Sequence, residues 1–178
     1  MRKNFIRKSQ FLTLFTVLFF FLGSFSALAE PIAQPFKMNE AGIKLIKRTG
    51  QDPDQVRQET LAEIPTKSSW HLPVYPGAKF ANRLKGNDNM FPTLNLISDD
   101  PPEKVRKWYR AHLKGWSFDE TYQIFHESRG KFDMGKMYTT QTVNVMATST
   151  EAIDLMFADE PNLKTRIQIM YDPAKLNQ

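Results

Sequence analysis

The sequence predicts an α+β protein: an antiparallel sheet with its helices on one face, preceded by a short helical N-terminal segment. Two observations support this prediction. From residue 90 onward, segments in which apolar and polar residues alternate, as in half-buried strands, flank one segment with the period of an amphipathic helix. Their order is strand, helix, strand, strand, short helix, strand, which is the split βαβ or ferredoxin-like arrangement. In that arrangement a right-handed crossover joins the first two strands.

Residues 1–29 predict a secretory signal peptide that precedes the fold. Four bases come before the apolar run 11–22, and small residues at 27–29 offer a cleavage site near Ala29. Because residues 11–28 approach the length of a membrane span, an uncleaved anchor in the inner membrane is the alternative. We expect cleavage and a periplasmic protein of a Gram-negative cell, although the sequence does not distinguish the periplasm from the medium outside.

The leader accounts for most of the net charge. The whole chain has 24 basic and 19 acidic residues, a net charge of +5, and all the acids lie after the leader. Without the four leader bases, 20 basic residues face 19 acidic ones. We therefore expect no nucleic-acid partner, and membrane contact only through an uncleaved leader. The chain has no cysteine, which excludes disulfides and thiol chemistry.

Residues 30–70 predict a polar segment with short helices, ahead of an α+β domain at 71–178. Residues 36–48 suit one short helix. In the second, Asp52 is placed to cap the helix, Pro53 takes the first helical position and Pro65 ends it. Because this helix has few apolar residues, we expect it to lie on the surface or to reach toward a partner.

The central helix of the domain follows a turn and a strand. Pro76-Gly77 predicts a type II turn, and residues 90–98 predict a strand. Asp100 then predicts the N-cap of a helix, with Glu103 three residues later completing a capping box.

This helix predicts two contrasting faces. At 100° per residue, one stripe is largely apolar and is expected to be buried: Val105, Trp108, Tyr109, His112 and Leu113. The opposite face is basic, and we expect it either to be solvated or to dock an anionic partner. The candidate partner-binding residues on that face are Lys104, Arg106, Lys107, Arg110 and Lys114.

The rest of the domain predicts strands. Residues 116–127 predict a single strand, residues 137–147 another, residues 150–157 a short helix, and residues 163–171 the last strand. The alternative topology is a meander of three strands behind one helix, with residues 150–157 as a bent strand.

The sequence offers few candidate catalytic or ligand-binding residues. The sequence lacks the nucleophile elbow, the phosphate-binding loop and the dinucleotide fingerprint. No catalytic or metal-ligating residue and no cofactor are assigned. Between the sheet and the N-terminal segment, His71, Tyr75 and His126 are the candidate ligand-binding residues.

One stretch resembles a known group of proteins. "LPVYPGAK", followed by a strand and "DDPPEKVRKWYRAHLKGW", is similar to a pattern in small uncharacterised bacterial envelope proteins and lipoproteins. There a Tyr-Pro-Gly-Ala turn precedes a strand and a Pro-Glu-x-Val helix with an aromatic-Tyr core. The match spans residues 72–118. It implies the fold and the compartment, and no established activity comes with it. This chain lacks the cysteine that the lipoproteins acylate.

The leading functional hypothesis is an exported, non-enzymatic accessory or partner-binding module of the bacterial cell envelope. Its expected contact surfaces are residues 30–70 and the basic helix face, and its expected partner is an envelope protein or another anionic molecule. The alternative is a small-ligand-binding protein or an enzyme that uses His71, Tyr75 and His126, so enzymatic activity stays an open question. A third hypothesis is copper handling through methionine and histidine. The sequence does not give the oligomeric state.

Overall fold

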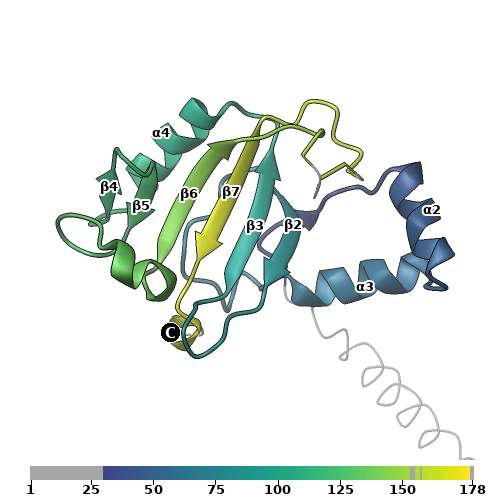
Figure 1. The fold of residues 1–178 in the computed structure, drawn as a ribbon, viewed down its shortest axis with the longest axis horizontal. Helices are drawn as coiled ribbons and strands as arrows, with labels where there is room; N and C mark the ends of the chain where they lie inside the picture. The colour runs from purple at the N-terminus through teal and green to yellow at the C-terminus, as the bar shows by residue number, and fades with distance from the viewer. Residues whose placement is uncertain (1–29, 153–154, 157, 177–178) are drawn as a thin grey trace, which may run out of the picture. The chain divides into compact units, whose positions relative to one another are not determined.

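The protein is built around a mixed seven-stranded sheet within the described residues, which confirms the α+β class. The computed structural model describes residues 30–152, 155–156 and 158–176, and contacts group residues 31–178 into one unit. The predicted signal peptide lies outside the described residues. The strand order is β1-β2-β3-β7-β6-β5-β4 (Figure 1). The strands are β1 (Gln34–Pro35), β2 (Lys79–Leu84), β3 (Thr93–Ser98), β4 (Ser117–Asp119), β5 (Ile124–His126), β6 (Thr142–Ala147) and β7 (Thr165–Met170).

The ferredoxin-like strand order is not confirmed. That arrangement would place the first and third strands of the unit, β3 and β6, side by side. Instead β7 lies between them and is antiparallel to both. The strands β4 to β7 thus form a meander, because each is antiparallel to the next one along the chain and lies beside it. Residues 153–154 and 157, part of the predicted short helix or bent strand, are outside the described residues.

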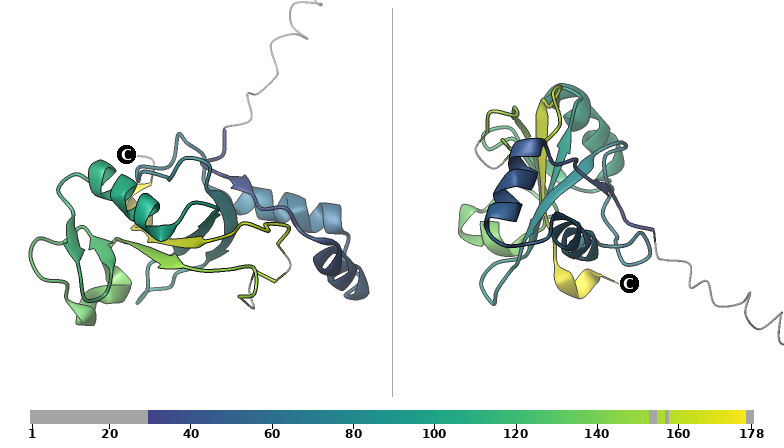
Figure 2. Two further views of the ribbon diagram at one scale, coloured as in Figure 1. Left: turned by 90° about the horizontal axis from the view of Figure 1, so that it is seen from above. Right: turned by 90° about the vertical axis from the view of Figure 1, so that its right-hand side faces the viewer.

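The helix α4 (Pro102–His112) crosses one face of the sheet and joins β3 to β4 (Figure 2, left). Its buried stripe is confirmed for Val105, Tyr109 and Leu113. Trp108 is only partly buried, and the prediction is wrong for His112, which is exposed near the end of the helix. The predicted N-cap is wrong: Pro101 is the cap residue, and the helix has no side-chain cap. The Asp100 carboxylate is instead occupied by hydrogen bonds from Tyr75 and Lys104.

The single strand predicted at 116–127 is also wrong. The structure has a short hairpin there, β4 and β5, joined by a turn in which Gln123 has a φ of 56°. The Asp119 carboxylate accepts hydrogen bonds from the backbone N–H groups of Thr121 and Tyr122, which closes the turn. An Asp side chain that bonds the backbone ahead of it competes with strand continuation.

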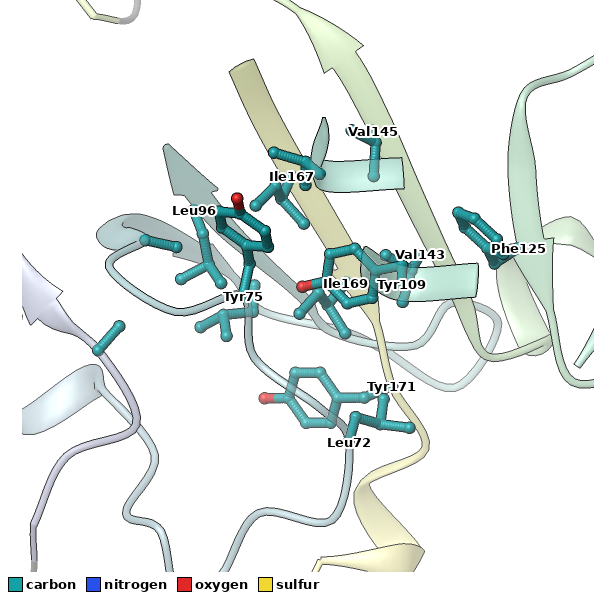
Figure 3. Packing of buried hydrophobic residues seen from close by; sticks show 14 of the residues in the cluster. Leu72, Tyr75, Leu96, Tyr109, Phe125, Val143, Val145, Ile167, Ile169 and Tyr171 are labelled. Atoms are coloured by element: carbon teal, nitrogen blue, oxygen red, sulfur yellow. The ribbon is translucent and has the colours of Figure 1, made fainter. Parts of the chain in front are cut away.

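The main core lies between α4 and the sheet. Leu94 and Leu96 of β3, Val143 and Val145 of β6, and Ile167 and Ile169 of β7 alternate onto this face and are buried by α4 and by residues 72–78. Figure 3 shows Tyr75, Tyr109 and Tyr171 packed among them. Each large side chain buried in this way contributes on the order of 1.5–3 kcal/mol.

A second, smaller cluster lies outside this core. It joins Ala81 of β2 and Ile97 of β3 to Leu155 and Leu163 of the β6–β7 connection. Phe36, which follows β1, packs against it. This cluster therefore fixes the start of the N-terminal segment to the domain.

The N-terminal segment is tied to the domain at both ends. β1 pairs with β2 in parallel, and Ile64 packs in the main core. A β-bridge between Pro31 and Thr66 joins the two ends of the segment to each other. Between these attachments lie α2 (Glu40–Arg48) and α3 (Pro53–Glu63), which extend away from the sheet (Figure 1). The side chain of Asp52 caps α3, with Pro53 as its first residue. Two short 3-10 helices complete the fold: η1 (Met134–Thr139) and η2 (Pro173–Lys175).

One register shift interrupts β2. Phe80 pairs with Leu96, and Asn82 pairs with Asn95. Phe80 and Asn82 are therefore two positions apart on β2, whereas their partners on β3 are adjacent. The extra residue, Ala81, forms a β-bulge. After the bulge, Asn82 lies on the sheet face opposite α4.

Candidate functional site

His71 lies in a polar network at the end of the sheet where β6 begins. Its Nε2 is 3.0 Å from Oε1 of Gln141, a side chain only 3% exposed. That oxygen also accepts the Asp172 backbone N–H, while Gln141 Nε2 donates to Glu127 Oε2 at 2.7 Å. Because Gln141 Oε1 is the acceptor, His71 must donate from Nε2. The exposed His71 ring is therefore held in one tautomer by a buried amide.

Glu127 completes this network. Its Oε2 accepts from Lys175 of η2 at 2.6 Å as well as from Gln141. Burial raises the pKa of Glu127, but the hydrogen bonds from Lys175 and Gln141 outweigh it, so the pKa lies below its usual value. The charged carboxylate thus ties the β5–β6 hairpin to the C-terminal segment. We call His71, Gln141, Glu127 and Lys175 the His71 network.

Tyr75 lies at the opposite end of the sheet, beyond the last residue of β3. Its hydroxyl donates to Asp100 Oδ2 at 2.8 Å, and Lys104 donates to Oδ1 at 2.8 Å. Burial and the adjacent carboxylate raise the pKa of Tyr75 to about 12. The hydrogen bonds from Lys104 and Tyr75 lower the pKa of Asp100. Asp100 therefore fastens the turn before β2 to the start of α4.

His126 lies on the other face of the sheet. Phe125 belongs to the core under α4, so its neighbour His126 points the opposite way. The buried His126 ring lies 2.7 Å from the Ser128 hydroxyl through Nδ1 and packs on Phe132, with ring centres 5.0 Å apart. The structure therefore does not bring His71, Tyr75 and His126 together, because they occupy two ends and two faces of the sheet.

The predicted basic face of α4 is partly used within the chain. Arg106 is only 23% exposed and donates to the Val145 carbonyl at 2.9 Å and to Glu103. Lys104 pairs with Asp100, and Arg110 lies 3.8 Å from Glu120 and over the Phe118 ring. Lys107 and Lys114 are exposed. Lys104 and Arg110 are also exposed but lie in surface ion pairs, so Arg106 is the one predicted base on this face that is packed into the fold.

A small hollow opens beside β2 and β3. The nearly buried Glu160 carboxylate forms an ion pair with Lys79 and accepts the Lys37 backbone N–H at 3.4 Å. This pair joins β2, the N-terminal segment and the β6–β7 connection, which is a structural role. The hollow is lined by Gly77, Lys79, Ile97, Ser98, Asp99 and Glu160.

The face of the sheet opposite α4 carries a feature that the sequence analysis missed. Register places four amide side chains in one row across four neighbouring strands. In Figure 1 this face is toward the viewer, and no helix lies across β3, β7 and β6. We call the row the amide row and the surface the amide face. The amide row consists of Asn82 of β2, Asn95 of β3, Gln168 of β7 and Asn144 of β6.

Two oxygens of the amide row lack a partner in the structure. Asn95 donates from Nδ2 to Asn82 Oδ1 at 2.7 Å, which fixes the orientation of both side chains. Asn95 Oδ1 and Asn144 Oδ1 are buried and accept no hydrogen bond. Because a buried polar atom without a partner is costly, these two carbonyls lower the stability of the sheet.

Other kinds of site receive less support. In the described part of the chain, no three His, Cys, Asp or Glu residues are grouped as metal ligands would be. Within the same residues, no helix has the length and apolarity needed to cross a membrane. Comparisons with protein families, curated proteins and solved structures found no match.

Proposed function

We propose that this protein is an exported, non-enzymatic, partner-binding module of the bacterial cell envelope. We further propose that its contact element is the projecting hairpin, residues 40–63, which comprises α2 and α3. The observation that supports this proposal is that the two helices bury few of their residues within the chain. In α3 no residue is buried, and in α2 only Gly42 is.

The projecting hairpin has the composition of a contact surface. Around α2, Gly42, Leu45 and Ile46 share one side, and Lys44 and Lys47 lie on the other. Gly42 is buried and Ile46 half-buried, whereas Leu45 is 45% exposed. An amphipathic helix whose apolar side is only partly covered within its own chain suits a groove on another protein.

The ends of the projecting hairpin are firmly held. Ile32 donates its backbone N–H to the Pro65 carbonyl at 3.0 Å, and Phe36 donates to the Phe80 carbonyl at 3.0 Å. Ile64 and Leu72, on the C-terminal side, belong to the main core. A partner that binds α2 would therefore engage an element already positioned, which lowers the entropy cost of binding.

The partner that fits best is an envelope protein with an apolar groove bordered by acidic residues. On α2, Lys44, Lys47 and Arg48 outnumber Glu40. The exposed Lys107 and Lys114 of α4 would provide a second basic contact surface. Such complementary charges mainly increase the association rate and the specificity.

The test is site-specific photo-crosslinking in cells at Leu45, compared with Tyr122, which is similarly exposed on the β4–β5 turn. We expect one protein adduct from position 45 only. With the probe kept at position 45, Ala41→Asp, at an exposed residue one turn earlier on α2, should abolish that adduct, whereas Leu84→Asp, at another exposed leucine, should not. Both variants should keep the thermal midpoint of the parent. Equal adducts at 45 and 122, or an Ala41→Asp variant that still crosslinks from position 45, would contradict the proposal.

The basic face of α4 is tested separately with Lys107→Glu and Lys114→Glu. We expect slower capture of the same partner with an unchanged thermal midpoint. Arg106 is excluded from this test because its bond to the Val145 carbonyl makes it part of the packing. Capture that is equally fast in the charge-reversed protein would restrict the contact to the projecting hairpin.

A second candidate function is small-ligand binding or catalysis at His71. The observation that favours it is the His71 network, in which a buried amide orients an exposed imidazole. A ligand at this site should shift the His71 ring signals in an NMR screen of small metabolites, and Gln141→Leu should abolish that response. Copper handling is a third candidate, and copper(I) titration of the purified chain tests it.

A further inference from the structure

Three exposed apolar side chains lie at the end of the sheet away from the projecting hairpin. Tyr122, on the β4–β5 turn, is 43% exposed, and Met134 and Tyr138 of η1 are 44% and 54% exposed. The views agree in placing β4, β5 and the green η1 at one end and α2 with α3 at the other (Figures 1 and 2). We call these three residues the edge patch, because β4 is the last strand of the sheet.

Phe132 connects the two parts of the edge patch. It is only 5% exposed, and its ring centre lies 6.1 Å from that of Tyr122 and 5.0 Å from that of the buried His126. Met134 follows Phe132 by two residues, and a 3-10 rise of about 2 Å per residue places it about 8 Å along η1 from Tyr138. The three exposed side chains therefore belong to one surface.

The backbone that carries the edge patch is held at both ends of η1. At the start, Asp133 Oδ1 accepts the Gly135 backbone N–H at 2.9 Å. At the end, the Tyr138 carbonyl accepts the Phe91 backbone N–H at 2.7 Å, which attaches η1 to the segment before β3. A ligand of the edge patch therefore meets side chains on an ordered backbone, which lowers the entropy cost of binding.

Basic residues accompany the edge patch. Residues 128–140 contain three bases, Arg129, Lys131 and Lys136, and one acid, Asp133, so the segment has a net charge of +2 (three minus one). All four side chains are exposed. Within the described residues Arg129 and Lys131 form no ion pair, whereas Lys136 lies 4.0 Å from Asp133. The segment therefore offers uncompensated positive charge beside apolar side chains.

The edge patch is small for a contact between two folded proteins. About half of roughly 200 Å² is exposed on each of its three side chains, which gives roughly 300 Å² in all. A stable protein interface uses about 800 Å² on each partner. A layer of lipid headgroups has no fixed shape to match, and it accommodates single tyrosines and long basic side chains. The size and composition of the patch therefore favour a membrane surface.

From these observations we propose that the edge patch docks on the surface of an anionic phospholipid membrane. The two tyrosines lie at headgroup level, Met134 enters the boundary of the acyl chains, and Arg129 and Lys131 attract the lipid phosphates. This proposal departs from the expectation that only the leader contacts a membrane, and it does not depend on the partner of the projecting hairpin. A lipid contact at Tyr122 gives no protein adduct, so the crosslinking comparison between positions 45 and 122 is unaffected.

The test is sedimentation of residues 31–178 with vesicles of phosphatidylglycerol or phosphatidylcholine. These residues form one contact unit without the apolar leader, which would itself bind vesicles. We expect binding to phosphatidylglycerol that weakens as salt is added, and far weaker binding to phosphatidylcholine. Arg129→Gln with Lys131→Gln should lower the affinity about 25-fold, because each base near an anionic surface contributes about five-fold. Met134→Asp should also lower it, by about ten-fold, since it removes an apolar contact and adds negative charge.

Two matched controls remove the same charge or the same kind of apolar group elsewhere. Lys107→Gln with Lys114→Gln neutralises two exposed bases of α4, and Leu84→Asp changes an exposed leucine of β2. Both should bind vesicles like the parent, and all variants should keep the parent's thermal midpoint. The proposal is overturned if phosphatidylglycerol vesicles are not bound at low salt, or if phosphatidylcholine is bound equally well. It is also overturned if the α4 control loses as much affinity as the patch variants, or if millimolar inorganic phosphate releases the protein, which would indicate a site for free phosphate.

Discussion

The two faces of the sheet use the same strands for different purposes. On the α4 face, Leu94, Leu96, Ile167 and Ile169 are fully buried in one apolar cluster. On the amide face, Asn95 and Gln168 stand between these residues, and Asn95 carries a buried carbonyl oxygen without a partner in the structure. The α4 face therefore supplies most of the apolar burial, whereas the amide face carries polar side chains on the same strands. Three predictions examine this contrast.

The largest effect is expected from Tyr109→Ala. Tyr109 is fully buried at the centre of the α4 face, and truncating a large aromatic side chain there should lower the free energy of unfolding by about 3–5 kcal/mol. Gln168→Ala, on the amide face, should change it by no more than about 0.5 kcal/mol. Urea denaturation of both variants measures the contrast. Similar losses in the two would mean that both faces support the fold equally.

A smaller effect of opposite sign is expected from Asn144→Val. Valine is a better strand former, and the substitution removes a buried carbonyl oxygen that has no partner in the structure. We expect the free energy of unfolding to rise by about 0.5–1 kcal/mol. The same denaturation assay measures the change. A destabilised Asn144→Val variant would show that Asn144 contributes to the fold.

The smallest effect concerns the loss of folding stability at acidic pH, which we assign to carboxylates at the ends of the α4 face. The folded-state pKa of Glu127 lies below its usual 4.5, so its stabilising contribution is present above that value and is lost as the pH falls through the folded-state pKa. Glu127→Gln should therefore flatten the acid side of the stability profile, by less than about 1 kcal/mol. Urea midpoints measured across the acid range test this. If the urea midpoint of Glu127→Gln falls with pH as steeply as that of the parent, another group, such as Asp100, causes the loss of stability in acid.

Much of the α4 face was predictable from sequence. Val105, Tyr109 and Leu113 follow the helical period, and that local pattern is enough to predict their burial. Asp100 was misassigned because a capping pattern is local, whereas its real partner, Tyr75, lies 25 residues earlier. The break in the strand near Gln123 depends on the Asp119 side chain, and alternation of apolar residues does not reveal it.

The strand order and the amide face could not be predicted from the pattern of apolar and polar residues. Whether β7 or β6 lies beside β3 depends on how the β6–β7 connection runs, and hydrophobic alternation is the same in both arrangements. Asn95, Asn144 and Gln168 each look like the polar positions of a solvated strand. Only the register, which comes from pairing across the sheet, shows that they form one row. The His71 network was missed in part for the same reason, since Gln141 and Glu127 meet across a hairpin.

The bulge at Ala81 has a consequence for how β2 tolerates a change in length. Removing one residue from a regular strand moves every later side chain to the opposite face. Ala81 is the extra residue, so its deletion would leave Phe80 opposite Leu96 and Asn82 opposite Asn95. The loss would be confined to its contact with the second apolar cluster. Among variants that shorten β2 by one residue, the deletion of Ala81 would therefore keep the later side chains of β2 on their present faces of the sheet.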